Sequence, residues 1–312
     1  MVDTQVKVGS LTLKNPVLVA SGTFGYGDEC RELVDVNLFG GIVTKSLSMK
    51  PREGNPPVRL AETASGMLNS IGLANIGVDR FIEEKLPYLR TLDTSVIVNI
   101  AGSTIDEYCE VLSTLEDCEG VDAYEINVSC PNVKEGGLSF GTNRQTVAEI
   151  TRRLRKRTQR PLVIKLTPNV THISEFAQAA ADAGADAVSL INAVVGMAVD
   201  IETKKPKLST TVGGLSGPAI KPIALAKVLE VARTVDIPII GIGGIMSPSD
   251  AIEFLLVGAT AIQVGTANFV DPSIAVKIIE GIKDYCGRKK LESVSDLVGA
   301  LELEKDVFTI NE

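Results

Sequence analysis

The stretch PLVIKLTPNVTHISEFAQAAADAGADAVSLIN, residues 161–192, contains one complete copy of the pattern that determines the fold. It begins with the apolar run Pro161–Leu166, continues through the alanine-rich amphipathic segment Ser174–Ala183, and ends with a second apolar run, Ala187–Asn192. Short continuous apolar runs are typical of strands that are buried on both faces. The pattern therefore predicts a strand–helix–strand unit of the kind that builds parallel sheets.

The same alternation recurs along the whole chain. Six further apolar runs are found at Pro16–Ala20, Gly41–Lys45, Ser95–Ile100, Ala123–Ser129, Pro238–Gly243 and Ala261–Gly265. Helical stretches such as Ile220–Thr234 separate several of them. Eight strands that alternate with helices predict a (β/α)8 TIM barrel, and because no linker divides the sequence we expect one domain over residues 1–312. A doubly wound nucleotide-binding sheet is the alternative, but no G-x-G-x-x-G motif follows the first strand.

A short hairpin is expected before the barrel. Residues Gln5–Leu13 alternate in polarity around Gly9-Ser10, as two short strands joined by a tight turn do. We expect this hairpin to close the bottom of the barrel.

Composition excludes several classes of function. The 312 residues carry a net charge of −8 and no tryptophan, which disfavours nucleic-acid binding. The five cysteines have no C-x-x-C pair, and the one histidine, His172, cannot complete a zinc site, so we expect reduced thiols and no bound metal. With no signal-peptide pattern and no apolar run of membrane-spanning length, the sequence predicts a cytoplasmic protein that does not bind membranes.

Polar residues and glycines follow nearly every predicted strand. They are Ser21-Gly22, Lys45-Ser46, Asn99, Asn127, Lys165, Asn192, Gly243-Gly244 and Gly265-Thr266. Because catalytic groups of TIM barrels lie at the carboxyl ends of the strands, these residues predict a site on one rim. Glycines after the seventh and eighth strands allow backbone N–H groups to approach an anion, which predicts a bound phosphate from a phosphorylated ligand or from FMN.

Two lysines and one cysteine are the candidates for chemistry. A lysine at a strand end can form a Schiff base, pair with an anion or lie on the surface. Lys165 should point into the barrel mouth, where its positive charge would suit the negative charge that a flavin gains on reduction. Lys45 could hold a substrate carboxylate. Cys130 lies in the constrained loop NVSCPN at 127–132, which favours a reactive thiol acting as a base. A Cys–His pair with His172 is disfavoured, and we interpret His172 as a surface loop residue.

These residues resemble those of class 1 dihydroorotate dehydrogenases over the whole chain, and the loop resembles class 1B. The most specific pieces are NSIGL at 69–73, NVSCPN at 127–132 and KEGG at 134–137. The resemblance implies FMN-dependent oxidation of dihydroorotate to orotate in de novo pyrimidine (UMP) biosynthesis, with one FMN per chain. It also implies that Cys130 removes the C5 proton while the C6 hydride passes to FMN.

The resemblance assigns the site residue by residue. The FMN-binding residues it implies are Ser21, Lys45, Ser46, Asn99, Asn127, Lys165, Ile191, Gly217, Gly243, Gly244, Gly265 and Thr266. The substrate-binding residues it implies are Lys45, Asn69, Ser70, Ile71, Gly72, Leu73, Asn127, Asn132, Asn192 and Ala193. Two positions depart from the family pattern: Ala193 stands where Thr or Ser is usual, which removes a hydroxyl, and Ala74 stands where Gln is common.

Class 1B enzymes pair with an electron-transfer subunit that carries FAD and a [2Fe-2S] cluster and passes electrons to NAD. The resemblance thus implies a heterotetramer of two catalytic and two electron-transfer chains around a catalytic homodimer. The absence of a four-cysteine cluster motif fits this arrangement, but it fits equally well a class 1A enzyme that uses fumarate. The loop Lys134–Phe140 favours class 1B. The alternatives are a dihydropyrimidine dehydrogenase-like reductase of uracil or thymine, and a non-enzymatic flavin- or phosphate-binding scaffold.

Overall fold

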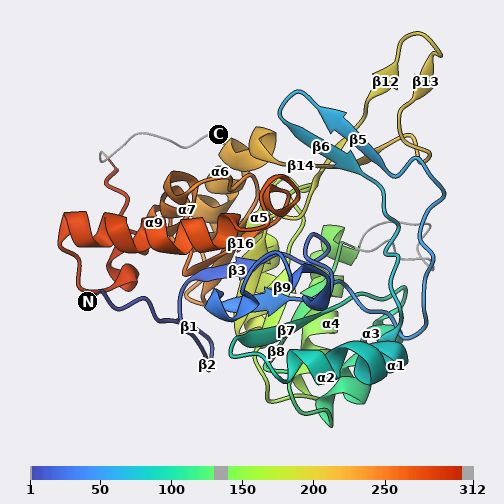
Figure 1. The fold of residues 1–312 in the computed structure, drawn as a ribbon. Coiled ribbons are helices and arrows are strands. Elements are labelled where there is room, and N and C mark those ends of the chain that lie inside the picture. Colours follow the sequence, from blue (N-terminus) through green and yellow to red (C-terminus); the bar gives the residue numbers. More distant parts are fainter. Residues whose placement is uncertain (1, 130–139, 304–312) are drawn as a thin grey trace.

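A closed barrel of eight parallel strands forms the centre of the molecule (Figure 1). The computed structural model describes residues 2–129 and 140–303. The barrel strands, in chain order, are β3 (Val17–Val19), β4 (Gly41–Val43), β7 (Ser95–Ile100), β8 (Ala123–Asn127), β9 (Leu162–Lys165), β10 (Ala187–Leu190), β15 (Ile239–Ile242) and β16 (Ala261–Val264). Each neighbours the next, and β16 pairs with β3 to close the barrel. All eight predicted strands are therefore confirmed, as is the TIM-barrel fold.

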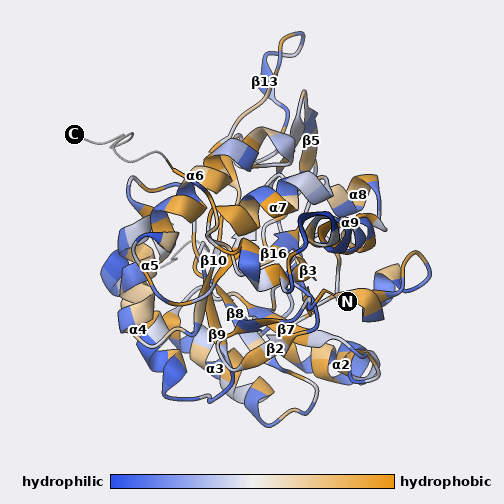
Figure 2. Cartoon of the chain, turned by 90° about the vertical axis from the view of Figure 1, so that its left-hand side faces the viewer, coloured by the Kyte–Doolittle hydropathy of each residue, from blue (hydrophilic) through white to orange (hydrophobic). Residues whose placement is uncertain are grey.

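The helices surround this barrel and cover its outer face (Figure 2). They are α1 (Val78–Arg80), α2 (Leu86–Leu89), α3 (Ile105–Glu116), α4 (Arg144–Arg155), α5 (Ile173–Asp182), α6 (Lys221–Ala232), α7 (Pro248–Leu256), α8 (Ala267–Val270) and α9 (Ile274–Lys289), with a π-helical turn at Phe81–Lys85 between α1 and α2. Side-chain caps begin three of them: Thr104 accepts from Glu107, Asn143 from Gln145 and Thr146, and Ser247 from Asp250. These polar side chains fix where the helices begin.

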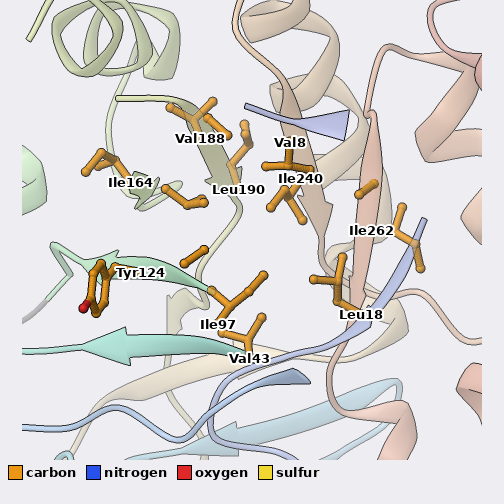
Figure 3. Packing of buried hydrophobic residues seen from close by; sticks show 14 of the residues in the cluster. Val8, Leu18, Val43, Ile97, Tyr124, Ile164, Val188, Leu190, Ile240 and Ile262 are labelled. Atoms are coloured by element: carbon orange, nitrogen blue, oxygen red, sulfur yellow. The ribbon is translucent and has the colours of Figure 1, made fainter. Parts of the chain in front are cut away.

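Apolar side chains fill the space between strands and helices, as Figure 3 shows for Tyr124, Ile164 and Val188 among others. Inside the barrel the composition changes. Leu18 and Ile97 occupy inward positions together with several polar side chains that hydrogen-bond to one another across the barrel. The barrel interior is thus only partly apolar, whereas its outer surface is almost wholly so.

The predicted N-terminal hairpin is present. Strands β1 (Val6–Val8) and β2 (Leu11–Leu13) pair antiparallel around Gly9, whose φ of +60° requires a residue without a side chain. A Cβ atom on Gly9 would come within 2.8 Å of Asp186, the residue that precedes β10. The hairpin therefore lies against the amino-terminal ends of the strands, which confirms that it closes the bottom of the barrel.

A second sheet, which the sequence analysis did not predict, lies at the opposite end. It joins β5 (Leu60–Thr63), β6 (Gly66–Asn69), β11 (Val194–Gly196) and β14 (Gly213–Ser216) in the order β11-β14-β6-β5. The loops that follow β4 and β10 supply these strands. A separate hairpin of β12 (Val199–Asp200) and β13 (Lys205–Pro206) projects from this end of the molecule (Figure 1).

Two further expectations can be compared with the described residues. The four cysteines among them, Cys30, Cys109, Cys118 and Cys286, are free thiols. His172 is exposed at the start of α5, which agrees with its interpretation as a surface residue. Within residues 2–129 and 140–303, no helix has both the length and the apolar character that a membrane crossing needs.

Candidate functional site

Two adjoining cavities open at the carboxyl ends of the barrel strands, beneath the β11-β14-β6-β5 sheet. The larger has a volume of about 640 Å³ and the smaller about 130 Å³. They share Ser21, Thr23, Asn69, Lys165, Asn192, Ala193, Ser216 and Thr266 in their walls. The larger volume lies in the usual range for cavities that bind small ligands.

Most of the predicted site residues line these cavities. The larger cavity is lined by Ser21, Lys45, Ser46, Asn69, Ser70, Ile71, Gly72, Leu73, Asn127, Lys165, Asn192, Ala193 and Thr266. The smaller one adds Ile191, Gly217, Gly243, Gly244 and Gly265. The structure therefore brings together residues from seven barrel strands or the loops that follow them. Their individual roles remain predictions.

Three predicted residues are not placed in the cavity walls. Asn99 is fully buried inside the barrel below the cavities, where its amide donates to Glu125 and its backbone N–H donates to Thr44. It stands one residue before the end of β7, and its role in binding FMN stays a prediction. Cys130 and Asn132, together with the loop 134–137, lie outside the described residues.

The two lysines of the larger cavity differ in their surroundings. The Lys165 ammonium lies 3.1 Å from the buried Glu125 carboxylate. The Lys45 ammonium makes no hydrogen bond or ion pair with any residue in the described part of the chain. Burial lowers the pKa of Lys45 below its ordinary value; the Arg59 charge adds to this effect and the Glu29 charge opposes it. Lys45 is thus a cation available to an anionic ligand, whereas Lys165 already has a counter-ion.

Asparagine side chains form the polar part of the wall. Asn192 donates to the side-chain amide oxygen (Oδ1) of Asn127 at 3.2 Å, and that oxygen also accepts from the Ser129 backbone N–H at 3.1 Å. Asn69 donates to the Gly214 carbonyl at 3.2 Å, which joins the wall to the β14 strand. Amides that are held in this way present fixed donors and acceptors to a planar ligand.

The segment 69–73 is held in place by a residue that the sequence analysis did not single out. Leu73 has a φ of +58°, which is costly for a leucine. The nearly buried Asn75 accepts from Gly77 at 2.9 Å and donates to the Leu73 carbonyl and the Ser48 hydroxyl, each at 2.8 Å. These hydrogen bonds stabilise the strained turn that presents Ile71, Gly72 and Leu73 to the cavity.

Glycine backbone lines the smaller cavity. Gly217, Gly243 and Gly244 have φ values of +95°, +127° and +73°. A Cβ atom on Gly244 would lie 2.8 Å from the Lys221 backbone nitrogen, and one on Gly217 would lie 2.7 Å from Gly66. No other residue fits these positions without strain, so bare backbone faces the cavity near the start of α7. This arrangement is suited to an anion such as a phosphate.

The residues present fit FMN. The smaller cavity offers a glycine cradle for the phosphate, and the larger one has room for a ring system beside two cations. No acidic side chain is found in the wall of either cavity among the described residues. The buried Asn99 carbonyl oxygen also lacks a hydrogen-bond partner within the described chain, as does that of Gln263. A ligand that is rich in donors and negatively charged at one end matches this set of groups.

The sequence analysis missed several parts of the site. The wall also includes Leu60, Met67, Val195, Gly214, Ser216 and Phe269. They come from α8 and from the β11-β14-β6-β5 sheet, which we call the rim sheet. The alternating residues on either side of Ser65-Gly66 were a signal for the β5–β6 hairpin. Glu125, Ser189 and Gln263, which lie inside the barrel, were visible as single polar residues within apolar strand runs.

Comparison with known proteins identifies the family. The family model described as dihydroorotate dehydrogenase matches residues 3–286. A protein of Citrifermentans bemidjiense named dihydroorotate dehydrogenase B (NAD(+)), catalytic subunit, is 53% identical over 301 residues, covering 96% of this chain and 99% of that protein. Proteins of the same name from Thermoanaerobacter sp. and Bacteroides thetaiotaomicron are 54% and 49% identical, with 96% and 97% of this chain and 99% and 100% of those proteins covered.

A solved structure supports the fold independently. The crystal structure of DHODH from Eimeria tenella in complex with ferulenol superposes with a TM-score of 0.80, covering 96% of this chain and 88% of that one at 22% identity. At this identity the likeness is evidence for the barrel alone. The family match and the close relatives extend over nearly the whole chain, which therefore belongs to the dihydroorotate dehydrogenase family of oxidoreductases.

Proposed function

We propose that this chain is an FMN-bearing catalytic subunit that oxidises dihydroorotate to orotate in de novo pyrimidine (UMP) biosynthesis. The observation that carries the proposal is the pair of adjoining cavities, one lined by glycine backbone and the other by two lysines and four asparagines. Orotate is a planar ring with amide groups and one carboxylate, so a cation and fixed amides pair with it directly. The names of the close relatives point to the same substrate.

The chain's own residues would divide the work as follows. Lys45, which has no counter-ion in the described chain, binds the substrate carboxylate, while Asn69, Asn127 and Asn192 orient the ring. The glycines of the smaller cavity bind the FMN phosphate, and Lys165 supplies a positive charge beside the ring system. When bound, FMN supplies the acceptor for the hydride that leaves the substrate.

Cys130 is the proposed base that removes the C5 proton. It directly follows Ser129, which lines the larger cavity at the end of β8. Among the described residues, no histidine, aspartate or glutamate lines the cavity and could serve as the base instead. A thiol ionises only partly at neutral pH, so we expect the rate of flavin reduction to rise with pH.

The proposed partners follow from the same relatives, whose names contain NAD(+) and "catalytic subunit". We propose that electrons pass to NAD through a separate subunit that carries FAD and a [2Fe-2S] cluster, in a heterotetramer built on a catalytic homodimer. The chain as a single domain would carry one FMN and would act in the cytoplasm. The isolated chain should therefore reduce artificial dyes with dihydroorotate, but reduce NAD poorly.

The decisive experiment is anaerobic mixing of the purified FMN-bound protein with dihydroorotate while the flavin absorbance is recorded. Bleaching by dihydroorotate and not by dihydrouracil is expected, because only the former carries the carboxylate that Lys45 binds. Cys130→Ala should keep FMN and orotate binding but lose most of the bleaching rate, and Cys130→Ser should recover part of it at high pH. Bleaching by dihydrouracil alone would identify a pyrimidine reductase, and a protein without flavin would favour a scaffold.

A further inference from the structure

A fully buried carboxylate lies in the barrel directly below the larger cavity. Glu125, in the middle of β8, has no exposed surface. Its Oε1 accepts from Asn99 at 2.6 Å and from Lys165 at 3.1 Å, and its Oε2 accepts from Ser189 at 2.8 Å and Gln263 at 2.6 Å. The donors come from β7, β9, β10 and β16, so one side chain connects five strands of the barrel.

Stability alone does not account for this arrangement. TIM-barrel interiors are ordinarily filled by branched apolar side chains. Replacing a buried ion pair by apolar residues of similar volume is often neutral or stabilising, because burying two charges is costly. The Glu125–Lys165 pair therefore has no evident advantage as a packing element, and its position is better explained by what lies above it.

Lys165 connects this pair to the proposed FMN site. Its side chain is 6% exposed and lines both cavities. An ammonium has three N–H donors. Glu125 takes one of them, and no other acceptor for Lys165 is found among the described residues. The carboxylate below thus holds the ammonium while leaving donors for a ligand above.

We propose that Glu125 is a positioning residue that fixes the Lys165 ammonium at the floor of the cavity and keeps it charged there. The inference rests on the proposed binding of FMN. With the charge retained, Lys165 favours the reduced, negatively charged form of the bound flavin. Without the carboxylate, a buried ammonium would lose its proton more readily, because burial disfavours the charged form.

The local electrostatics support this role. Burial raises the pKa of Glu125, but the Lys165 charge and the hydrogen bonds from Gln263, Ser189 and Lys165 outweigh it, so the pKa lies below its ordinary value. The Glu125 carboxylate is therefore charged, and it lies 3.1 Å from the Lys165 ammonium. The other titratable group in the cavity walls, within the described chain, is Lys45. Tyr108 lies outside these walls, and its hydroxyl donates to the Asn127 backbone carbonyl at 2.7 Å.

The remaining strands bring no further charge to the pair. β7, β10 and β16 contribute the neutral side chains of Asn99, Ser189 and Gln263, and the inward residues of β3, β4 and β15 are apolar or glycine. Among the described residues, a change in the ionisation of Lys165 would therefore be compared with that of Lys45 alone, and the Cys130 thiol is present in every protein compared. This makes a titration of the bound flavin's reduction potential interpretable.

The test is the midpoint potential of FMN bound to the full chain, measured as a function of pH in Glu125→Gln, in Glu125→Gln/Lys165→Met and in the wild-type protein. In Glu125→Gln, the uncompensated ammonium should favour reduced FMN about tenfold at the acid end, which is about 30 mV for a two-electron couple. As the pH rises and Lys165 loses its proton, this shift should disappear. The curve of midpoint potential against pH for Glu125→Gln should therefore contain one additional ionisation. The double variant should lack that ionisation.

A merely structural role of Glu125 would lower thermal stability and FMN affinity without adding an ionisation. A Glu125→Gln curve that runs parallel to the wild-type curve at every pH would therefore overturn the inference. If Glu125→Gln does not fold, the midpoint potential of Lys165→Met is compared with that of the double variant. In Lys165→Met, Glu125 has lost its cationic partner and should take up a proton, and the double variant has no carboxyl group there to do so. Identical curves for those two would overturn it as well. Wild-type protein that binds no FMN would instead overturn the proposed function.

Discussion

Removal of the Lys45 charge should weaken the binding of orotate more than the binding of uracil, which lacks the carboxylate. Lys45 makes no ion pair within the described chain, so Lys45→Met leaves no unpaired carboxylate behind. The loss is then that of one hydrogen bond between charged groups, about 1.5–3 kcal/mol. Since 1.4 kcal/mol is about a tenfold change in affinity, the dissociation constant for orotate should rise between about 10-fold and 100-fold.

The assay is a titration of the oxidised FMN-bound protein with orotate, followed by the change in flavin absorbance. Uracil, which lacks the carboxylate, serves as the control ligand, and its affinity should change less than twofold. Lys283→Met serves as the control variant, because Lys283 is an exposed lysine on α9 far along the chain from the cavity residues. Equal losses for orotate and uracil in Lys45→Met would show that Lys45 acts through packing rather than charge.

The same titration has a defined pH dependence. Burial lowers the pKa of Lys45 below its ordinary 10.5, so the ammonium is charged at neutral pH and is lost as the pH rises through the lowered value. Orotate affinity of the wild-type protein should therefore fall on the alkaline side, at a lower pH than that at which an exposed lysine loses its proton. In Lys45→Met this alkaline limb should be absent. An alkaline limb of equal size in both proteins would refute the assignment of Lys45 to the carboxylate.

Two further substitutions test how the site is built. Asn75→Ala removes the hydrogen bonds that hold Leu73 at positive φ. It should lower the free energy of unfolding, measured by urea denaturation, by about 2–3 kcal/mol and should weaken orotate binding. Unchanged stability would contradict this role of Asn75. Gly244→Ala places a Cβ atom 2.8 Å from the Lys221 backbone nitrogen and should weaken FMN binding, measured by fluorescence titration, at least about tenfold. The control is Gly287→Ala, at an open position on α9, which should bind FMN as the wild-type protein does.

The sequence was sufficient to predict the barrel because its strands are buried on both faces. The run Pro238–Gly243, for example, is continuously apolar and is bounded by proline and glycine, and its strand in the structure lies within the predicted range. The rim sheet could not be predicted in the same way. Its strands are three or four residues long and half exposed, and β6 pairs with β14, which lies nearly 150 residues further along the chain. Such pairing depends on the closed barrel that brings the two loops together.

The site was predicted to the level of which residues meet, because strand ends of a parallel barrel share one rim. Asn99 shows where this reasoning stops. It stands near the end of its strand like Asn127, yet its strand runs one residue further and its amide turns to Glu125 inside the barrel. Its burial inside the barrel was not predicted, and its role in binding FMN stays a prediction. Periodicity does not fix strand ends to within one residue.

The two cavity lysines illustrate what only the tertiary structure adds. In the sequence both follow apolar strands and both are candidates for an anion. In the barrel, Lys165 lies one inward position above the Glu125 carboxylate of the neighbouring strand, because the register pairs Asn127 with Lys165 and Glu125 with Val163. Lys45 follows β4, whose inward positions carry no acid. Lys165 is therefore half of a neutral pair, whereas Lys45 is a net positive charge. For this reason the substrate carboxylate is assigned to Lys45, and the response to flavin reduction is assigned to Lys165.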